Sequence, residues 1–128
     1  MPLMAFSLSS TTPLWRTSAA YTGHPALRDG KLYAIRGGTA IIDAIDVTNG
    51  TVLGSTDLGA DKGQLGGNIV ITGSHLFVSN GTATYALDLQ QTGFPIVWTA
   101  PQGGALAITP DNQLIVSASG GLFAYKLG

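Results

Sequence analysis

The 128-residue sequence contains no cysteine and no glutamate, and charged residues make up only 10% of it. Without cysteine, the chain has no disulfide, no thiol nucleophile and no cysteine-ligated zinc site. Helix surfaces normally carry glutamate, lysine and glutamine, so a chain without glutamate and with little lysine is unlike a helical protein. A formal net charge of −1 with scattered cations predicts no strong field that would attract nucleic acid or an anionic membrane.

Long apolar runs are missing as well. The uninterrupted apolar runs fall far short of the roughly 20 residues that a membrane-spanning helix needs. Residues 1–5 show neither a basic segment nor an apolar stretch, so no signal peptide is expected. What replaces the missing residue types is glycine, of which there are 18, together with serine, threonine, valine and isoleucine. This is an all-β composition, and its frequent occurrence in periplasmic and extracellular β-proteins is the only indication of the compartment.

One short phrase recurs along the chain and organises the rest. It reads Tyr-Ala-Leu-Asp-Leu at 85–89, and related copies lie at 4–8, 43–47 and 123–127. The copies begin at residues 4, 43, 85 and 123, so their spacings are 39, 42 and 38 residues. Self-similarity at a fixed period of about 40 residues is typical of a repeat protein.

Each unit reads as four short strands separated by turn signals. An Asp-Gly pair at 29–30 and an Asn-Gly pair at 49–50 lie between apolar segments, as in tight hairpins. The first strands of the units are expected near 24–27, 68–71 and 105–108, and each follows a glycine. These glycines are Gly23, Gly67 and Gly104. Before the first unit, strands are expected at 4–8 and 13–18, with a loop over 19–23.

Four strands in about 40 residues match the length and strand number of a β-propeller blade. The alternative all-β fold is a compact sandwich with evenly spaced strands. Sandwiches do not usually repeat their sequence this closely, so we predict about three four-stranded antiparallel propeller blades, forming a partial ring or half of an oligomeric ring. The expected units are residues 1–23 (outer strands that complete a blade), 24–66 (a blade), 67–104 (a blade) and 105–128 (a blade without its last strand).

The stretch from Ala86 to Trp98 resembles the blade motif of the quinoprotein-dehydrogenase-like β-propellers (PQQ-type repeats), roughly Ala-x-Asp-x-x-Thr-Gly-x-x-x-Trp. Ala86, Asp88, Thr92, Gly93 and Trp98 fit this motif, with one extra residue on each side of the turn. The resemblance implies that the tryptophan docks between neighbouring blades and that the alanine and glycine make room for it.

The other copies fit the motif in part. The second copy has Asp46 and Gly50, but Leu53 stands where the tryptophan is expected. The first copy has Ala5 and Trp15, and the last has a lysine in place of the aspartate. The enzymes of this family carry a vicinal cysteine pair and a calcium-bound cofactor set. Because this chain lacks cysteine and glutamate, quinone catalysis and a bound cofactor are not expected.

The two ends of the chain pose a problem of assembly. Counting strands gives three blades and one strand over, whereas propeller rings typically hold four to eight blades. An open stack exposes blade faces and unpaired edges, so we expect self-association, for example two chains in a six-bladed ring. The first and last copies of the phrase, 4–8 and 123–127, then compete for one place. The competing interpretation is that the missing blades belong to a longer parent chain.

Ligands of propellers usually meet loops at one end of the central channel. The loops expected there contain polar residues that could bind a small polar ligand or a peptide, and the same residues could instead cap strand ends or hold channel water. The strongest candidates are His24, Asn68, Arg36, Asp61 and Gln64, and the remaining polar residues of these loops are Tyr21, Lys62, Asn80 and Gln102.

Other chemistry-bearing residues read as structural. His24 and His75 lie at different places in the repeat, so the two histidines are not expected to share a metal. Asp46 and Asp88 occupy equivalent turn-flanking positions, where carboxylates accept backbone N–H bonds. The sequence therefore favours a non-catalytic binding or scaffolding module that self-associates through its blade edges. The alternatives are a fragment of a larger quinone- or sugar-active propeller enzyme and a carbohydrate-binding propeller.

Overall fold

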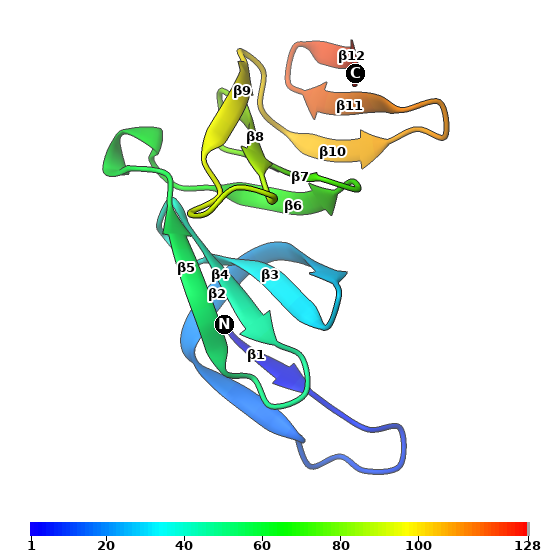
Figure 1. Ribbon diagram of the computed structural model, residues 1–128. Coiled ribbons are helices and arrows are strands. Elements are labelled where there is room, and N and C mark those ends of the chain that lie inside the picture. Colours follow the sequence, from blue (N-terminus) through cyan, green and yellow to red (C-terminus); the bar gives the residue numbers. More distant parts are fainter. Residues whose placement is uncertain (128) are drawn as a thin grey trace.

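The structure is a computed structural model that describes residues 1–127, and it is built almost wholly of β-strands (Figure 1). This confirms the predicted all-β class. The elements are β1 (Pro2–Ala5), β2 (Trp15–Arg28), β3 (Lys31–Arg36), β4 (Ile41–Asp46), β5 (Val52–Asp57), the 3₁₀ helix η1 (Ala60–Lys62), β6 (Gly66–Ile71), β7 (His75–Ser79), β8 (Thr84–Asp88), β9 (Ile96–Ala100), β10 (Ala105–Ile108), β11 (Gln113–Ala118) and β12 (Gly121–Lys126).

The strands form three antiparallel meanders that follow one another along the chain (Figure 1). Blade I consists of the second half of β2 with β3, β4 and β5, and blade II consists of β6 to β9. Blade III consists of β10, β11 and β12. The N-terminal hairpin, formed by β1 and the first half of β2, lies at the opposite end of the molecule from blade III (Figure 1). Three propeller blades, the last with three strands, agree with the prediction.

Strand β2 is longer than the sequence suggests, because the loop predicted over 19–23 is part of it. Tyr21 and Thr22 pair with Arg36 and Ile35 of β3, and the Tyr21 N–H also donates to the Met1 carbonyl at 2.7 Å. The expected loop is therefore held on both sides by backbone partners that lie far away in sequence. One continuous strand carries the chain from the N-terminal hairpin into blade I.

Strand β1 is shorter than predicted, since it ends at Ala5 rather than at residue 8. The Leu14 N–H donates to the Ala5 carbonyl at 2.6 Å, and the chain turns between these two residues. Phe6 and Leu8 therefore lie in the loop of the hairpin, where both are largely exposed. The first copy of the repeated phrase is thus only partly a strand.

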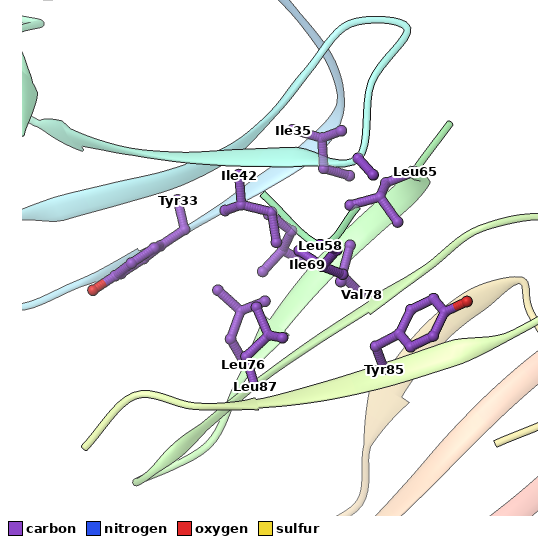
Figure 2. Close-up of a cluster of buried hydrophobic side chains, with 11 residues drawn as sticks. Tyr33, Ile35, Ile42, Leu58, Leu65, Ile69, Leu76, Val78, Tyr85 and Leu87 are labelled. Atoms are coloured by element: carbon purple, nitrogen blue, oxygen red, sulfur yellow. The ribbon is translucent and has the colours of Figure 1, made fainter. Parts of the chain in front are cut away.

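The main core lies between blades I and II (Figure 2). Blade I contributes side chains from β3 and β4, blade II contributes side chains from β6, β7 and β8, and the connection from β5 to β6 adds two leucines. Its buried members are Tyr33, Ile35, Ala40, Ile42, Leu58, Leu65, Ile69, Leu76, Val78, Tyr85 and Leu87. A second core between blades II and III contains Phe77, Ala86, Leu106, Leu114 and Val116. Neighbouring blades thus pack face to face, as in a propeller.

Strand register corrects the predicted tryptophan position in blade I. The alanine of the repeated phrase pairs with Trp15 in the N-terminal hairpin and with Trp98 in blade II. In blade I the equivalent Ala44 pairs with Gly54, and the same register shift follows the alanine in blades I and II. The residue at the tryptophan position is therefore Gly54, and the assignment to Leu53 was wrong.

Trp15 docks on blade I as the resemblance implied. Its indole Nε1–H donates to the Val47 carbonyl at 2.9 Å. A Cβ atom added to Gly50 would lie 2.5 Å from Cε3 of the indole, so only glycine leaves room for the ring. Gly93, the equivalent glycine of blade II, has no atom within 4 Å of such a Cβ and therefore makes room for nothing.

Trp98 docks between blades II and III. Its ring makes edge-to-face contacts with Phe77, at 6.4 Å between centroids, and with Tyr125, at 5.1 Å. Truncation of a buried tryptophan costs about 3–5 kcal/mol, but Trp98 is only partly buried, so we expect Trp98→Ala to cost about 2–3 kcal/mol, most of it from packing and the aromatic pairs. Urea denaturation measures this, with the exposed neighbour Val97→Ala as control. An unchanged free energy of unfolding would contradict a structural role for Trp98.

Candidate functional site

The connections that were predicted to share one end of the blades do meet there. The Leu65 N–H, on the connection from β5 to β6, donates to the Thr39 carbonyl in the turn of blade I at 3.0 Å. The Asn80 Nδ2 amide, in the equivalent turn of blade II, donates to the Lys62 carbonyl at 2.8 Å. The long connection thus bridges the two turns, and it brings Lys62 Nζ to 6.0 Å from the centroid of the Tyr85 ring.

His24 and Asn68 are neighbours, because they form the parallel pair that joins β2 to β6. The Asn68 amide is already engaged. Its Nδ2 donates to the Leu106 carbonyl at 2.8 Å, and its Oδ1 accepts the Leu106 N–H at 2.9 Å. This side chain replaces a backbone pairing between blades II and III, so Asn68 is a structural link. His24 is exposed.

Arg36 belongs to a buried ionic cluster, which we call the Asp43 cluster. Asp43 is fully buried and accepts two bonds from Arg36, from Nη2 at 2.7 Å and from Nε at 3.1 Å. The Tyr21 hydroxyl donates to Oδ2 at 2.7 Å, and the Ser55 hydroxyl donates to Oδ1 at 2.6 Å. Arg36, which was predicted to contact a ligand, therefore uses its guanidinium group to bind a carboxylate of its own blade.

The Asp43 cluster shifts the pKa values of Asp43 and Tyr21 in opposite directions. Burial raises the pKa of Asp43, but the bonds from Arg36, Ser55 and Tyr21 outweigh it and hold the pKa below its ordinary value. Burial, together with the bond to Asp43, raises the pKa of Tyr21 to about 12. Both pKa values are thus shifted away from neutral pH, whereas an efficient general acid or base has a pKa close to the pH at which it works, so the cluster has the character of a structural ion pair.

The last two predicted residues make no direct polar contact with the others among residues 1–127. Asp61 forms an exposed ion pair with Lys62, at 2.7 Å between Oδ2 and Nζ, and Gln64 is exposed. Within residues 1–127 no hydrogen bond or ion pair joins Asp61 or Gln64 to Arg36, His24 or Asn68. Of the five candidates, only His24 and Asn68 are paired directly in the sheet, and a shared ligand site of all five stays a prediction.

The remaining carboxylates examined in the sequence are turn caps, as predicted. Asp46 Oδ1 accepts the N–H and the hydroxyl of Thr48, at 2.9 and 2.6 Å. Asp88 accepts the N–H of Gln90 and the side-chain amide of Gln91, at 2.9 and 2.7 Å. Over residues 1–127, no cluster of three or more histidine or acidic side chains is placed to hold a metal ion.

Sequence reasoning missed a cavity of about 580 Å³ between blades II and III. Phe77, Trp98 and Tyr125 give it an aromatic wall, and His75 and Lys126 give it polar edges. Its volume suits a small ligand. One signal pointed there: in the last copy of the phrase, Lys126 stands where the two middle copies have an aspartate. The Asp43 cluster had a similar signal, because Asp43 stands where the other copies have methionine, tyrosine and phenylalanine.

No protein-family model matches the sequence, and the comparison with curated proteins finds no match. Among solved structures, BamB from Moraxella catarrhalis has a TM-score of 0.70 at 14% identity, over 98% of this chain and 43% of that one. A quinohemoprotein alcohol dehydrogenase from Pseudomonas putida has a TM-score of 0.66 at 15% identity, over 84% and 19%. A europium-containing methanol dehydrogenase has a TM-score of 0.53 at 18% identity, over 78% and 21%.

The chain spans less than half the length of each of these structures. At such identities the likeness is one of fold. No helix among residues 1–127 is long and apolar enough to cross a membrane. The chain therefore has the fold of a β-propeller, with blades similar to those of BamB and the quinoprotein dehydrogenases.

Proposed function

We propose that this chain is a non-catalytic propeller module that assembles with a second copy of itself through its terminal blade edges and serves as a binding or scaffolding surface. The observation that carries the proposal is the edge of β12. Within residues 1–127, β12 pairs with β11 alone, whereas β4 and β8, the equivalent strands of the other two blades, each have a neighbour on both sides. Such an edge is a template for strand pairing.

The opposite end of the molecule supplies a strand of the matching kind. The first half of β2 stands in the repeat where β5 and β9 stand, as the fourth strand of a blade. It pairs with β1, which contains the first two residues of the first copy of the phrase, and β12 contains most of the last copy. We infer that β12 of one chain takes the place of β1 on β2 of the other, which resolves the competition between the two copies.

Exposed apolar side chains gather at these two ends. Leu122 on β12 is 74% exposed, and Leu14, just before β2, is 67% exposed. Met4 and Phe6 add further exposed apolar surface at the N-terminal hairpin. Apolar surface at both ends of an open stack favours end-to-end association, and two three-bladed chains give a closed ring with twofold symmetry.

The engagement of the polar side chains supports a non-catalytic role. Asp43 is neutralised by Arg36 in the interior, and Asp46 and Asp88 cap their own turns. Asn68 joins two blades. These side chains are engaged in holding the fold together, so none of them is free to act as a general acid or base.

The register of the repeat makes the association testable by crosslinking. In the N-terminal hairpin Met4 pairs with Arg16, and Phe123 is the equivalent of Met4. A disulfide is therefore expected between the Phe123→Cys variant and the Arg16→Cys variant when the two are mixed and oxidised. The control is Leu122→Cys, because a shift of one residue turns the side chain to the other face of the strand. The chain has no cysteine of its own, so every crosslink is an engineered one.

Light scattering of the unchanged protein is the companion measurement. We expect a mass of twice the 13.1 kDa of the chain at micromolar concentration. Leu122→Lys should shift the protein towards monomer, because a charge blunts an edge strand, whereas Leu27→Lys, an exposed leucine of blade I, should not. A monomer without the crosslink would overturn the proposal and would favour blades supplied by a longer parent chain.

A further inference from the structure

A second cavity, of about 240 Å³, lies between blades I and II. We call it the Gly54 slot. It is bordered on blade I by residues of β3, β4 and β5, and on blade II by residues of β8 and of the turn after it. The residues that the argument uses are Tyr33, Ala44, Gly54, Leu87, Gly93 and Phe94. The slot lies within one chain, so it does not depend on self-association.

The repeat shows what fits the slot. At both other junctions the fourth strand of the preceding blade places a tryptophan, Trp15 or Trp98, opposite the alanine of the phrase. At this junction Gly54 has that register position. A Cβ atom added to Gly54 would have no atom within 4 Å, so the space that an indole occupies elsewhere is open here.

On the blade II side of the slot, the space next to Gly93 is also unoccupied. Gly50 receives the Trp15 ring at the junction of the N-terminal hairpin with blade I, with 2.5 Å between an added Cβ and the ring. Gly93 is its equivalent in blade II and has nothing within 4 Å. The glycine that accommodates an indole is thus present, but the indole is not.

The repeat also indicates a hydrogen-bond acceptor for the ring nitrogen, the carbonyl of Leu89, two residues beyond Leu87 of the slot lining. Trp15 Nε1–H donates to the Val47 carbonyl, and Leu89 is the equivalent of Val47. The two N–H groups bond to equivalent turn carbonyls, Val47 to Gly30 at 3.0 Å and Leu89 to Ser74 at 2.9 Å, which fixes the equivalence. Over residues 1–127 no hydrogen bond to the Leu89 carbonyl is found.

Phe94 closes one side of the slot without filling it. The turn of blade II is longer than that of blade I, and Phe94 lies on this extension with a φ of 49°. Its ring meets Tyr33 of blade I edge to face, at 6.2 Å between centroids. This contact links the blades where the tryptophan is missing, and the remaining volume has the size of a small ring system rather than of a peptide.

We propose that the Gly54 slot binds a free indole-type molecule, a planar bicyclic aromatic with one N–H donor. The walls stack on the ring in place of the missing side chain, and the N–H donates to the Leu89 carbonyl. Apolar cavities of about 150 Å³ in other proteins bind benzene, so a slot of this volume is large enough for a bicyclic ring.

Indole itself is the probe, and chemical-shift mapping of the unchanged protein is the first measurement. We expect saturable changes centred on the backbone amides of Gly54, Gly93 and Phe94. 1-Methylindole, which lacks the donor, should bind several-fold more weakly. Changes centred on Trp15 or Trp98 instead, or no saturable change at millimolar indole, would overturn the proposal.

Gly54→Trp is the decisive variant, because it places a tethered indole in the slot. We expect indole binding to weaken at least tenfold and the melting temperature to rise. Gly54→Ala is the matched control and should bind indole within about twofold of the unchanged protein, since its methyl group meets no atom. If Gly54→Trp fails to fold, Ala44→Leu fills the slot from blade I and should weaken binding in the same way. Unchanged binding in a folded slot-filling variant would overturn the proposal.

Discussion

Replacing Gly23 by alanine is expected to destabilise the chain by about 5 kcal/mol, enough to leave a small domain largely unfolded. A Cβ atom at this position would lie 2.1 Å from the backbone carbonyl oxygen of Gly67, and neither backbone can move without breaking the pairing of His24 with Asn68. Overpacking of this kind costs about 1–3 kcal/mol, and a left-handed φ of 71° adds about 1–2 kcal/mol for alanine. Loss of the pairing between β2 and β6 accounts for the remainder of the expected destabilisation.

Gly38→Ala separates the two causes. Gly38 has a φ of 74°, close to that of Gly23, but a Cβ there would meet no atom within 4 Å. The control variant should therefore lose only the conformational part, about 1–2 kcal/mol. Urea denaturation followed by circular dichroism measures both. Equal losses in the two variants would show that the close approach of β2 to β6 contributes nothing.

The glycines illustrate how far the repeat allowed prediction. A glycine precedes the first strand of each unit, and alignment of the copies is enough to single out Gly23 and Gly67. Alignment also placed Trp15 against the next blade, where Gly50 makes room for it. These features are local and recur at a fixed period, which is why sequence alone could find them, although the close contact differs between copies: an added Cβ would lie 2.1 Å from a carbonyl oxygen at Gly23 and 3.5 Å from one at Gly67.

Features that depend on register or on distant partners were out of reach. Nothing in the alternation of apolar residues marks the register shift after Ala44, although the spacing of the motif counted from Ala44 already places the tryptophan position at Gly54. The continuity of β2 through residues 19–23 depends on Met1 and on β3. Neither partner can be recognised from the local sequence, which is polar and glycine-containing.

The candidate site was harder to predict than the fold, because it too depends on partners that are distant in the sequence. The Asp43 cluster joins residues from β2, β3, β4 and β5, and its members are separated by up to 34 positions, from Tyr21 to Ser55. Arg36 was recognised as functional because it is polar and lies near a turn. Its structural role, the ion pair with Asp43, follows from the strand pairing that places the two side chains next to each other.

The Asp43 cluster carries the second large prediction: Arg36→Met should cost about 3–5 kcal/mol at pH 7. The variant keeps the aliphatic part of the side chain but leaves the fully buried Asp43 carboxylate with only two hydroxyl donors. Arg36 itself is 37% exposed, so solvent screens its attraction, and most of the cost comes from the charge left behind. Asp43→Asn leaves an arginine that can turn to water, and should cost only about 1–3 kcal/mol.

The double variant, with Arg36→Met and Asp43→Asn together, decides between this account and a simple loss of packing. Removing the stranded charge should recover part of the cost of Arg36→Met, so that the double variant is more stable than the Arg36→Met single variant. Additive losses, measured by urea denaturation at pH 7, would mean that the buried charge is not what destabilises Arg36→Met.

Replacing Arg36 by methionine should reverse the sign of the pH dependence that Asp43 gives to the free energy of unfolding. In the unchanged protein the folded pKa of Asp43 lies below its unfolded value of 3.8, so the carboxylate contributes stability above that value and the contribution is lost as the pH falls through the folded pKa. Without Arg36, burial dominates and raises the folded pKa above the unfolded one, so acidification towards pH 4 should stabilise Arg36→Met while leaving Asp43→Asn without either trend. Unfolding free energies at pH 7, at pH 4 and at a pH below 3.8 measure the two trends, and parallel trends in the unchanged protein and in Arg36→Met would contradict the role assigned to the ion pair.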